Sequence, residues 1–531
     1  MWHGQPSTTY ELIREAIDDD PDRVFLVFPD QRLTYREFDE RVQLARRALL
    51  GFGVSHGDNV GLLFHNSPDF FALMWAAQSI GAVSVPINNR NRASELAYVV
   101  TDAQIRLVFT STLGQEITDL PGRLTEGLDM LEPGRRPHVI VLEHGDRVGL
   151  PTSREVLAAA ASADVTELED RTSAVRPDDI ALMIYTSGTT ANPKGVPMLH
   201  RQLLSVGRQT GERWGARRGD TFWNALPCFH MSSTLPMLAA LFAHGTWLSS
   251  PVFNAGEAIA MMSEFQVDLA WPAFGSIWQE ILVHPEFEPS LISSLRAALA
   301  VAPPETIHVL EAAAPHVALL SCYGITEGIG VPVMVRWDDS REIRTGTGGL
   351  PFEGFEVEIR DPESGSIQPR GERGAIWIRG ANLFLGYWND PVRTSEVFDE
   401  RGFFDTGDLG VMDEYGHVSY LGRIKDMLKV GGENVAAIEI EEHISTHPAV
   451  KLVAVVGAPD AKYGEVPAAY IELRPGASAS EQDLIAHCQG RIASFKVPRY
   501  VRFVTEWPMS ATKIRKIDLR DWITEELQQP T

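Results

Sequence analysis

Cysteine is scarce in this chain, which has only Cys228, Cys322 and Cys488 among 531 residues. The three lie far apart and show no paired spacing of the kind that metal sites use. We therefore expect neither a disulfide framework nor a cysteine metal site. The three side chains are predicted to be buried thiols of a protein in a reducing cytoplasm.

Basic residues are also in short supply, because 47 Lys and Arg stand against 71 Asp and Glu, for a formal net charge of −24. A field of this sign repels nucleic acid and anionic membrane surfaces, so we expect neither as a partner. A polyanionic ligand would need a locally basic site.

Long apolar runs are missing as well. The longest candidate, residues 235–248, is 14 residues long and contains His244 and Gly245, whereas a membrane span needs roughly 18 apolar residues. The N-terminal region carries Asp18, Asp19 and Asp20 and no apolar signal core. We expect no transmembrane segment and a cytoplasmic protein.

The chain is long enough for at least two domains. Thr34 followed by Glu37 predicts a capping box at the start of a helix that ends near Gly51. Strand signals at 59–64 and 82–86 flank a helical pattern at 69–80. Such alternation predicts α/β architecture, with a parallel sheet covered by helices.

One glycine- and hydroxyl-rich stretch, Tyr185-Thr-Ser-Gly-Thr-Thr-Ala-Asn-Pro-Lys-Gly195, follows a predicted buried strand at 180–184. A generic Ser/Thr/Gly cluster is more often a surface turn. Here glycine, four hydroxyl groups and one lysine together offer what phosphate oxygens need. The Gly-Lys-Ser/Thr order of the common P-loop is absent from this stretch.

The stretch closely resembles the Thr-Ser-Gly-Thr-Thr-Gly-x-Pro-Lys-Gly signature of the adenylate-forming superfamily, which comprises acyl-CoA synthetases, luciferases and peptide-synthetase adenylation domains. Ala191 stands where glycine is usual. The resemblance implies that the loop holds the β- and γ-phosphates of ATP, through Thr186, Ser187, Gly188, Thr189, Thr190 and Lys194.

A second motif, Tyr323-Gly-Ile-Thr-Glu327, follows an apolar run. Its carboxylate could simply be solvated, but Mg²⁺ usually takes one or two carboxylates alongside phosphate oxygens. The motif resembles the family's Tyr-Gly-x-Thr-Glu. The resemblance implies that Thr326 contacts phosphate, that Glu327 binds Mg²⁺ and that Tyr323 stacks on adenine.

Two further stretches of the large domain resemble motifs of the family and occur in the same order along the chain. Residues 224–231 resemble the Leu-Pro-x-Phe-His element, which implies that His230 lines the acyl pocket or the thiol channel; a lone histidine is otherwise more often a core residue. By the same analogy Trp271 to Gly275 shape the acyl pocket. Residues 402–408 are predicted to form a loop whose Asp408 binds the ribose hydroxyls.

The run Gly422-Arg-Ile-Lys-Asp426, with Gly431 and Gly432 beyond it, is either a solvated hairpin or a domain boundary. Resemblance to the family's hinge element implies that Arg423 contacts ribose and that Lys425 is the pivot. The two glycines would let the pantetheine arm of coenzyme A pass close to the backbone. Strands at 452–456 and 468–471 and helices at 438–444 and 481–492 predict a compact α+β domain.

Lys513 matches the family's catalytic lysine, which reaches the substrate carboxylate and the α-phosphate; Lys516 is the second candidate. The glycine usual before this lysine is missing, and the segment is one residue short. An exposed lysine on a basic tail is the ordinary alternative. A placed cation would lower the repulsion between an attacking carboxylate and a phosphate.

Together these features predict an α/β enzyme with a large N-terminal domain of several subdomains (1–423) and a small mobile α+β domain (424–531). The expected reaction activates a fatty or aryl acid with MgATP to acyl-AMP and pyrophosphate, and then transfers the acyl group to coenzyme A. Three alternatives stay open: a non-CoA acceptor (a carrier-protein thiol, an amine or nitrite), a luciferase-like oxidase and a non-catalytic binding module. A homodimer is compatible with the sequence.

Overall fold

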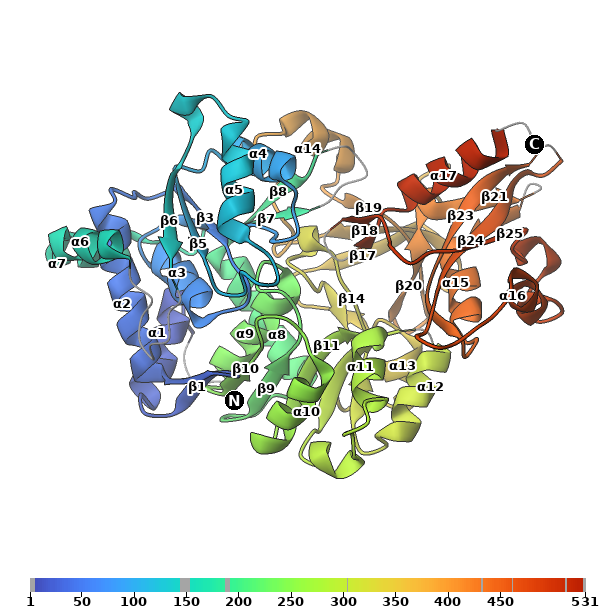
Figure 1. The fold of residues 1–531 in the computed structure, drawn as a ribbon, viewed down its shortest axis with the longest axis horizontal. Coiled ribbons are helices and arrows are strands. Elements are labelled where there is room, and N and C mark those ends of the chain that lie inside the picture. Colours follow the sequence, from blue (N-terminus) through green and yellow to red (C-terminus); the bar gives the residue numbers. More distant parts are fainter. Residues whose placement is uncertain are drawn as a thin grey trace. The chain divides into compact units, whose positions relative to one another are not determined.

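The computed structural model describes residues 5–143, 153–186, 192–302, 304–430, 433–460, 462–510 and 513–528. The chain divides into two compact units. The first unit comprises residues 1–356 and 379–403, and the second comprises 357–378 and 404–531. Figure 1 shows the helices and strands of both units.

A seven-stranded sheet forms one half of the first unit. All neighbouring strands in it are parallel except the last pair. The order is β13 (Ala318–Leu320), β12 (Ala297–Val301), β11 (Leu269–Phe274), β9 (Thr221–Asn224), β10 (Thr246–Leu248), β1 (Val24–Phe28) and β2 (Gln31–Thr34). The carboxyl ends of its parallel strands therefore share one edge, where open α/β sheets bind ligands.

A six-stranded sheet forms the other half. Its strand order is β6 (His138–Leu142), β5 (Leu107–Ser111), β3 (Asn59–Leu63), β4 (Val83–Pro86), β7 (Ile180–Thr186) and β8 (Lys194–Leu199). The pairings are parallel except for the β7–β8 hairpin. The predicted phosphate loop connects these two strands.

Helices flank both sheets in the first unit (Figure 1). They are α1 (Thr9–Asp19), α2 (Tyr35–Gly51), α3 (Pro68–Ser79), α4 (Ala93–Asp102), α5 (Leu120–Asp129), α6 (Arg154–Ser162), α7 (Val165–Ala174), α8 (His200–Trp214), α9 (Met231–Phe242), α10 (Ala255–Glu264), α11 (Gly275–Leu282), α12 (Pro304–Ala313), α13 (Arg341–Gly346) and α14 (Pro391–Val397). The capping box is confirmed, since the Glu37 N–H donates to Thr34 Oγ1 (3.2 Å) and the Thr34 N–H donates to Glu37 Oε2 (2.8 Å). Outside the gaps in the description, no helix is both long and apolar enough to cross a membrane.

Tryptophan fills much of the first unit's core. Six tryptophans there are less than 2% exposed: Trp75, Trp214, Trp223, Trp247, Trp271 and Trp278. The rings of Trp214 and Trp271 meet edge to face, with centroids 4.8 Å apart. The carboxyl ends of the parallel strands, which we call the ligand edge of the sheet, thus lie on a closely packed aromatic interior.

The second unit contains a four-stranded sheet of β17 (Glu356–Arg360), β18 (Arg373–Arg379), β19 (Phe404–Met412) and β20 (Val418–Arg423). The predicted loop at 402–408 is wrong, because residues 404–412 are a strand paired with β18 and β20. Asp408 accordingly lies within a ladder, opposite Arg423. Strand pairing with distant segments overrides the turn signal of Thr-Gly-Asp.

A five-stranded sheet follows in the same unit. It is built from β22 (Glu433–Ala436), β21 (Met427–Val430), β24 (Gly464–Leu473), β23 (Val450–Asp460) and β25 (Tyr500–Phe503), with α15 (Ala437–Ser445), α16 (Glu481–Cys488) and α17 (Lys516–Gln528). The helix predicted over 481–492 ends at Cys488, because Gln489 is already extended, with a ψ of 131°, and Gly490 follows with a φ of 71°. The domain boundary predicted near Arg423 stays a prediction.

Cysteines of both units are free thiols. Cys228 and Cys488 are buried, as predicted. Cys322 is only partly buried, on the short strand β14 (Cys322–Tyr323), which pairs with β15 (Val333–Met334). The remaining short strands are β16 (Leu350–Pro351), β26 (Met509–Ser510) and β27 (Lys513–Ile514).

Candidate active site

The β7–β8 hairpin carries the predicted phosphate loop. Thr186 and Lys194 are opposite each other at its loop end, one as the last residue of β7 and the other as the first residue of β8. Both side chains are partly buried. Ser187, Gly188, Thr189 and Thr190 lie outside the described residues, so their role in phosphate binding stays a prediction.

The side chains of Lys194 and Glu327 both contact Tyr387. Its ammonium nitrogen lies 3.5 Å from the Tyr387 hydroxyl oxygen and 4.5 Å from the centre of that ring. The Tyr387 hydroxyl in turn donates a hydrogen bond to Glu327 Oε1 at 2.9 Å. A tyrosine that is 7% exposed therefore joins the predicted phosphate-binding lysine to the predicted metal-binding carboxylate.

Two backbone hydrogen bonds fix the segment that carries Tyr387. The Phe384 N–H donates to the Glu327 carbonyl oxygen (2.9 Å), and the Trp388 N–H donates to the Gly195 carbonyl oxygen (2.8 Å). We call residues 384–388 the tyrosine strap. Sequence reasoning missed it; the only local signal is an aromatic pair directly after Gly386, whose φ is 146°.

Glu327 lies in a tight turn. A 3₁₀ turn at Thr326–Gly328 is followed by Ile329, which has a φ of 55°. A Cβ atom on Gly324 would lie 2.7 Å from the Gly330 carbonyl oxygen, so the chain can close here only with glycine at position 324. Tyr323, at the start of this motif, is 4% exposed, and its stacking on adenine stays a prediction.

The oxygen groups at this turn suit a metal ion that arrives with phosphates. Glu327 offers a carboxylate, and the preceding Thr326 adds a hydroxyl group. Across the ranges that the structure describes, no group of three or more His, Cys, Asp or Glu could hold a metal by itself. One carboxylate fits Mg²⁺, which commonly completes its shell with substrate phosphate oxygens and water.

His230 caps α9 rather than standing alone in the core. Its Nδ1 accepts the Ser232 N–H (3.3 Å) and lies 2.5 Å from Ser232 Oγ. The loop before it is held by buried Asn66, whose amide donates to the Leu226 carbonyl oxygen (3.0 Å) and accepts the Cys228 N–H (2.6 Å). These contacts set the position of His230, while its part in acyl or thiol binding stays a prediction.

The segment predicted to shape the acyl pocket ends strand β11 at the ligand edge. Ala273 has a φ of 58°, in the left-handed region that alanine rarely adopts. The β11–β12 register shifts between Ala270 and Ala273. Phe274, the next residue, is 42% exposed. Strain of this kind often marks a ligand site.

In the second unit, Asp408 and Arg423 form an ion pair. The Arg423 Nε atom lies 2.9 Å from Asp408 Oδ1, and Arg423 Nη1 donates to the Thr406 carbonyl oxygen (2.9 Å). The Asp408 side chain is 2% exposed and that of Arg423 33%. The two predicted ribose-binding residues are therefore neighbours on β19 and β20, although ribose binding itself stays untested.

Lys425 lies in a 3₁₀ turn, Ile424–Asp426, directly after β20. Burial lowers the pKa of Lys425, an effect that neighbouring Asp426 partly opposes. Gly431 and Gly432 lie outside the described residues. Lys513 opens β27, where it pairs with Ser510, and its side chain is not described. The second candidate, Lys516, has its Nζ 2.7 Å from Glu441 Oε1.

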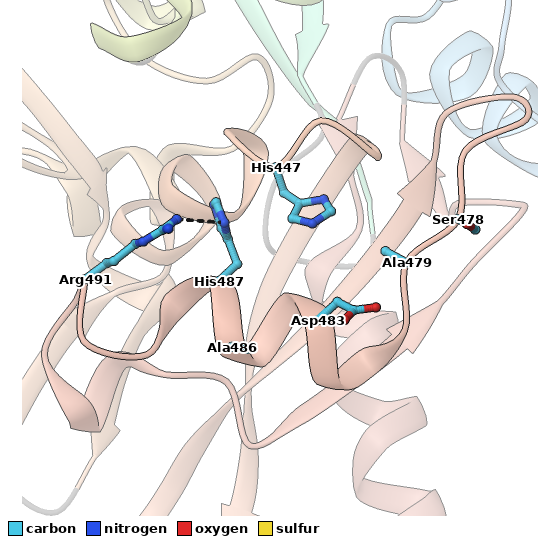
Figure 2. A pocket seen from close by; sticks show the side chains of 7 residues that line it. All are labelled: His447, Ser478, Ala479, Asp483, Ala486, His487 and Arg491. Atoms are coloured by element: carbon cyan, nitrogen blue, oxygen red, sulfur yellow. Dashed lines mark hydrogen bonds between the residues drawn. The ribbon is translucent and has the colours of Figure 1, made fainter.

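A shallow hollow elsewhere in the second unit contains none of the predicted site residues (Figure 2). Figure 2 shows His447, His487 and Arg491 around it, with Arg491 Nη1 3.1 Å from His487 Nδ1. Burial lowers the pKa of His487, and the neighbouring His443, His447 and Arg491 lower it further. The hollow also holds Asp483, so its charge is mixed.

Comparison with known proteins places these features in one family. The model of the AMP-binding enzyme family matches residues 13–388, and that of the AMP-binding enzyme C-terminal domain matches residues 439–513. The chain belongs to the AMP-binding enzyme family. Membership of the adenylate-forming superfamily is thereby confirmed.

Relatives within the family match the chain over nearly its whole length. The putative acyl-CoA synthetase YngI of Bacillus subtilis is 33% identical over 536 residues, covering 97% of each chain. The ATP-bound structure of MatB from Rhodopseudomonas palustris is 29% identical with a TM-score of 0.82, covering 98% of this chain and 100% of MatB. The anthranilate CoA ligase AuaEII in complex with anthranoyl-AMP is 26% identical with a TM-score of 0.85, covering 99% of both. The predicted α/β fold, with a large AMP-binding domain and a small C-terminal domain, is confirmed.

Proposed function

We infer that the protein is an AMP-forming acyl-CoA ligase, which activates a carboxylic acid with ATP and transfers the acyl group to coenzyme A. One observation carries this inference: Lys194 and Glu327, from two separate loops, meet through the Tyr387 hydroxyl. A cation for phosphate next to a carboxylate for Mg²⁺ is what MgATP requires. Relatives that match over nearly the whole length and are named as an acyl-CoA synthetase and a CoA ligase support it.

In the first step the acid's carboxylate attacks the α-phosphorus of ATP, and pyrophosphate leaves. Lys194 and the phosphate loop would bind the β- and γ-phosphates, with Tyr323 at the adenine and Asp408 and Arg423 at the ribose. Glu327 would hold the Mg²⁺ that accompanies ATP and neutralises its phosphates. Lys513 and Thr326 would offset the repulsion between the carboxylate and the α-phosphate, which otherwise opposes attack.

In the second step the thiol of coenzyme A attacks the acyl carbon, and AMP leaves. We propose that the C-terminal domain rotates about Lys425 between the steps, since a few backbone positions can absorb such a motion. Gly431 and Gly432 would border the pantetheine arm, and His230 would lie at the acyl pocket or thiol channel. Exclusion of water protects the acyl-AMP from hydrolysis.

Fatty and aryl acids are the substrate classes that we propose. Phe274 at the exposed end of β11 offers an aromatic surface to an apolar acyl group. Among the relatives, AuaEII is named as an anthranilate CoA ligase. A cytoplasmic location and a homodimer stay predictions.

Release of pyrophosphate tests the proposal. The full-length protein is incubated with MgATP and a panel of fatty, aryl and small polar acids, with and without coenzyme A. We expect pyrophosphate with at least one acid, and the matching thioester when coenzyme A is present. Pyrophosphate that never leads to a thioester would favour a non-CoA acceptor. Oxygen uptake would favour an oxidase. Absence of turnover with every acid would favour a non-catalytic module.

A further inference from the structure

The tyrosine strap connects two loops that would otherwise be independent. One is the end of the phosphate loop at Lys194 and Gly195, and the other is the turn that holds Glu327. The strap bonds to both through backbone groups, at the Glu327 and Gly195 carbonyl oxygens. The strap therefore ties the backbone beside Lys194 to the backbone of the Glu327 turn.

The strap is itself firmly anchored. The Tyr387 N–H donates to Thr394 Oγ1 of α14 at 2.9 Å. The Trp388 indole N–H donates to the carbonyl oxygen of Asp102, the last residue of α4, at 3.2 Å. The Phe384 and Tyr387 rings meet edge to face with centroids 5.0 Å apart. With backbone and ring both held, the hydroxyl has a fixed position before any ligand binds.

The Tyr387 hydroxyl lies between two groups of opposite charge, the Lys194 ammonium group and the Glu327 carboxylate. An ammonium group and a carboxylate attract each other, and both must face MgATP to bind it. The Tyr387 hydroxyl donates to Glu327 and lies 3.5 Å from the ammonium nitrogen, so one fixed group contacts both. The ring face adds a cation–π contact with the ammonium group at 4.5 Å.

We propose that Tyr387 is a positioning residue for MgATP, which orients the Glu327 carboxylate for the metal ion and holds the Lys194 ammonium group beside the phosphate loop. The proposal rests on the proposed function and adds to it a residue and an element, the strap. It follows the general rule that a preorganised site loses less free energy on binding than one that must rearrange.

Tyr387→Phe in the full-length protein tests this directly, because phenylalanine keeps the ring and removes only the oxygen atom. We expect the Mg²⁺ concentration for half-maximal pyrophosphate release to rise about tenfold, as the loss of a hydrogen bond to a carboxylate predicts. Calorimetry should show about tenfold weaker binding of ATP with Mg²⁺ and at most about a twofold change with EDTA. Calorimetry needs no turnover, so it tests the strap even if the protein proves not to be a ligase.

Matched variants separate positioning from a general loss of structure. Tyr35→Phe removes another tyrosine hydroxyl, which donates to the Gly245 carbonyl oxygen, and should leave the Mg²⁺ requirement unchanged. Thr394→Val removes the acceptor of the Tyr387 N–H and should shift the Mg²⁺ requirement in the same direction as Tyr387→Phe. It also supplies the test if Tyr387→Phe does not fold.

A double-mutant cycle shows whether Tyr387 acts through Glu327. In a Glu327→Gln background, Tyr387→Phe should change the affinity for MgATP by less than about twofold, since the oriented carboxylate is already gone. Equal effects in both backgrounds would overturn the proposal. A folded Tyr387→Phe protein with the Mg²⁺ requirement of the wild type would overturn it as well.

Discussion

At the scale of single residues, Glu327 is the side chain on which the proposed ATP site most depends. It is the carboxylate of the turn motif, and Tyr387 holds its Oε1 atom. Glu327→Gln keeps the size and the hydrogen-bond acceptor but removes the charge. We expect pyrophosphate release at fixed Mg²⁺ to fall about 100-fold, because transition-state charge on the phosphates loses its metal partner.

A rate assay across a series of Mg²⁺ concentrations measures this effect. Glu264→Gln is the control, since that glutamate forms only an exposed ion pair with Arg32. A Glu327→Gln enzyme with the wild-type rate and Mg²⁺ dependence would remove Glu327 from the metal site.

Asp408 offers a second test at this scale. Asp408→Asn breaks the pair with Arg423 and should reduce both ATP affinity, by about tenfold, and the free energy of unfolding, by about 1–3 kcal/mol. The carboxylate is buried, so its replacement affects stability even without ligand. Calorimetry with ATP and urea unfolding measure the two effects separately.

Glu358→Gln is the matched control for Asp408→Asn. It breaks a pair with Arg360 in the same sheet, where the closest atoms are 2.7 Å apart. Stability should fall while ATP affinity stays the same. If both variants weaken ATP binding equally, Asp408 supports the sheet and does not contact the ribose.

The sequence alone indicates functional residues when the groups that act together are neighbours along the chain. Lys194 and Glu327 were found because each belongs to a short motif with a recognisable mixture of groups. Tyr387 could not be found this way, since its partners lie 193 and 60 residues away along the chain. Only the folded structure brings a tyrosine after a turn between a lysine and a glutamate.

At the scale of elements, the junction of α1 and α8 should make stability depend on pH. His200, the first residue of α8, is fully buried, and its Nδ1 accepts the Thr9 N–H at 3.2 Å. Burial lowers the pKa of His200 to about 4. The unfolded chain, with a histidine pKa of about 6.5, binds the proton more readily between these values.

The contribution of His200 to the free energy of unfolding is therefore fully present above about pH 6.5. It falls by roughly 3 kcal/mol as the pH drops toward about 4. Urea unfolding at pH 7.5 and at pH 5 measures the change. His200→Gln does not titrate, so its unfolding free energy should vary less over this range. The same pH dependence in both proteins would assign the effect to other groups.

Strand β11 supplies a prediction about strain. Ala273→Gly should raise the free energy of unfolding by about 0.5–1 kcal/mol, because glycine adopts a φ of 58° without a Cβ clash. The control is Ala270→Gly in the same strand, which has no such φ and should destabilise the protein by about 1 kcal/mol. Thermal unfolding of both variants decides the matter. Destabilisation by both would mean that the methyl group of Ala273 contributes more by packing than it costs in strain.

Elements with local signals were predictable and those set by distant pairing were not. The start of α2 followed from Thr34 and Glu37, whose side chains satisfy the first backbone groups of the helix. The sequence predicts a loop over residues 402–408, which contain Thr-Gly-Asp. Their partners on β18 and β20 instead hold them in a sheet.

At the scale of the whole molecule, the strands β17 to β20 decide where the chain can be shortened. A chain ending at Asp426 keeps all four strands and both Asp408 and Arg423. We expect it to fold and to bind ATP but to form little thioester, since it lacks the rest of the C-terminal domain. Circular dichroism, ATP calorimetry and a thioester assay measure these three properties.

A chain ending at Phe403 is the comparison, because it leaves β18 without β19. We expect it to melt at a lower temperature and to bind ATP weakly. Equal behaviour of the two shortened chains would show that the four-stranded sheet is not needed for the nucleotide site.

The distribution of tryptophan between the two units has an optical consequence. The six enclosed indole rings of the first unit should emit at short wavelength and be shielded from iodide, whereas Trp522 of the second unit, 44% exposed, should emit at longer wavelength and be quenched readily. Trp337 of the first unit is also 38% exposed, so the long-wavelength emission comes from both units, whereas the short-wavelength emission comes from the six enclosed rings of the first unit. Loosening of the first unit's core would therefore be visible as a shift of the blue emission to longer wavelength, together with new quenching by iodide.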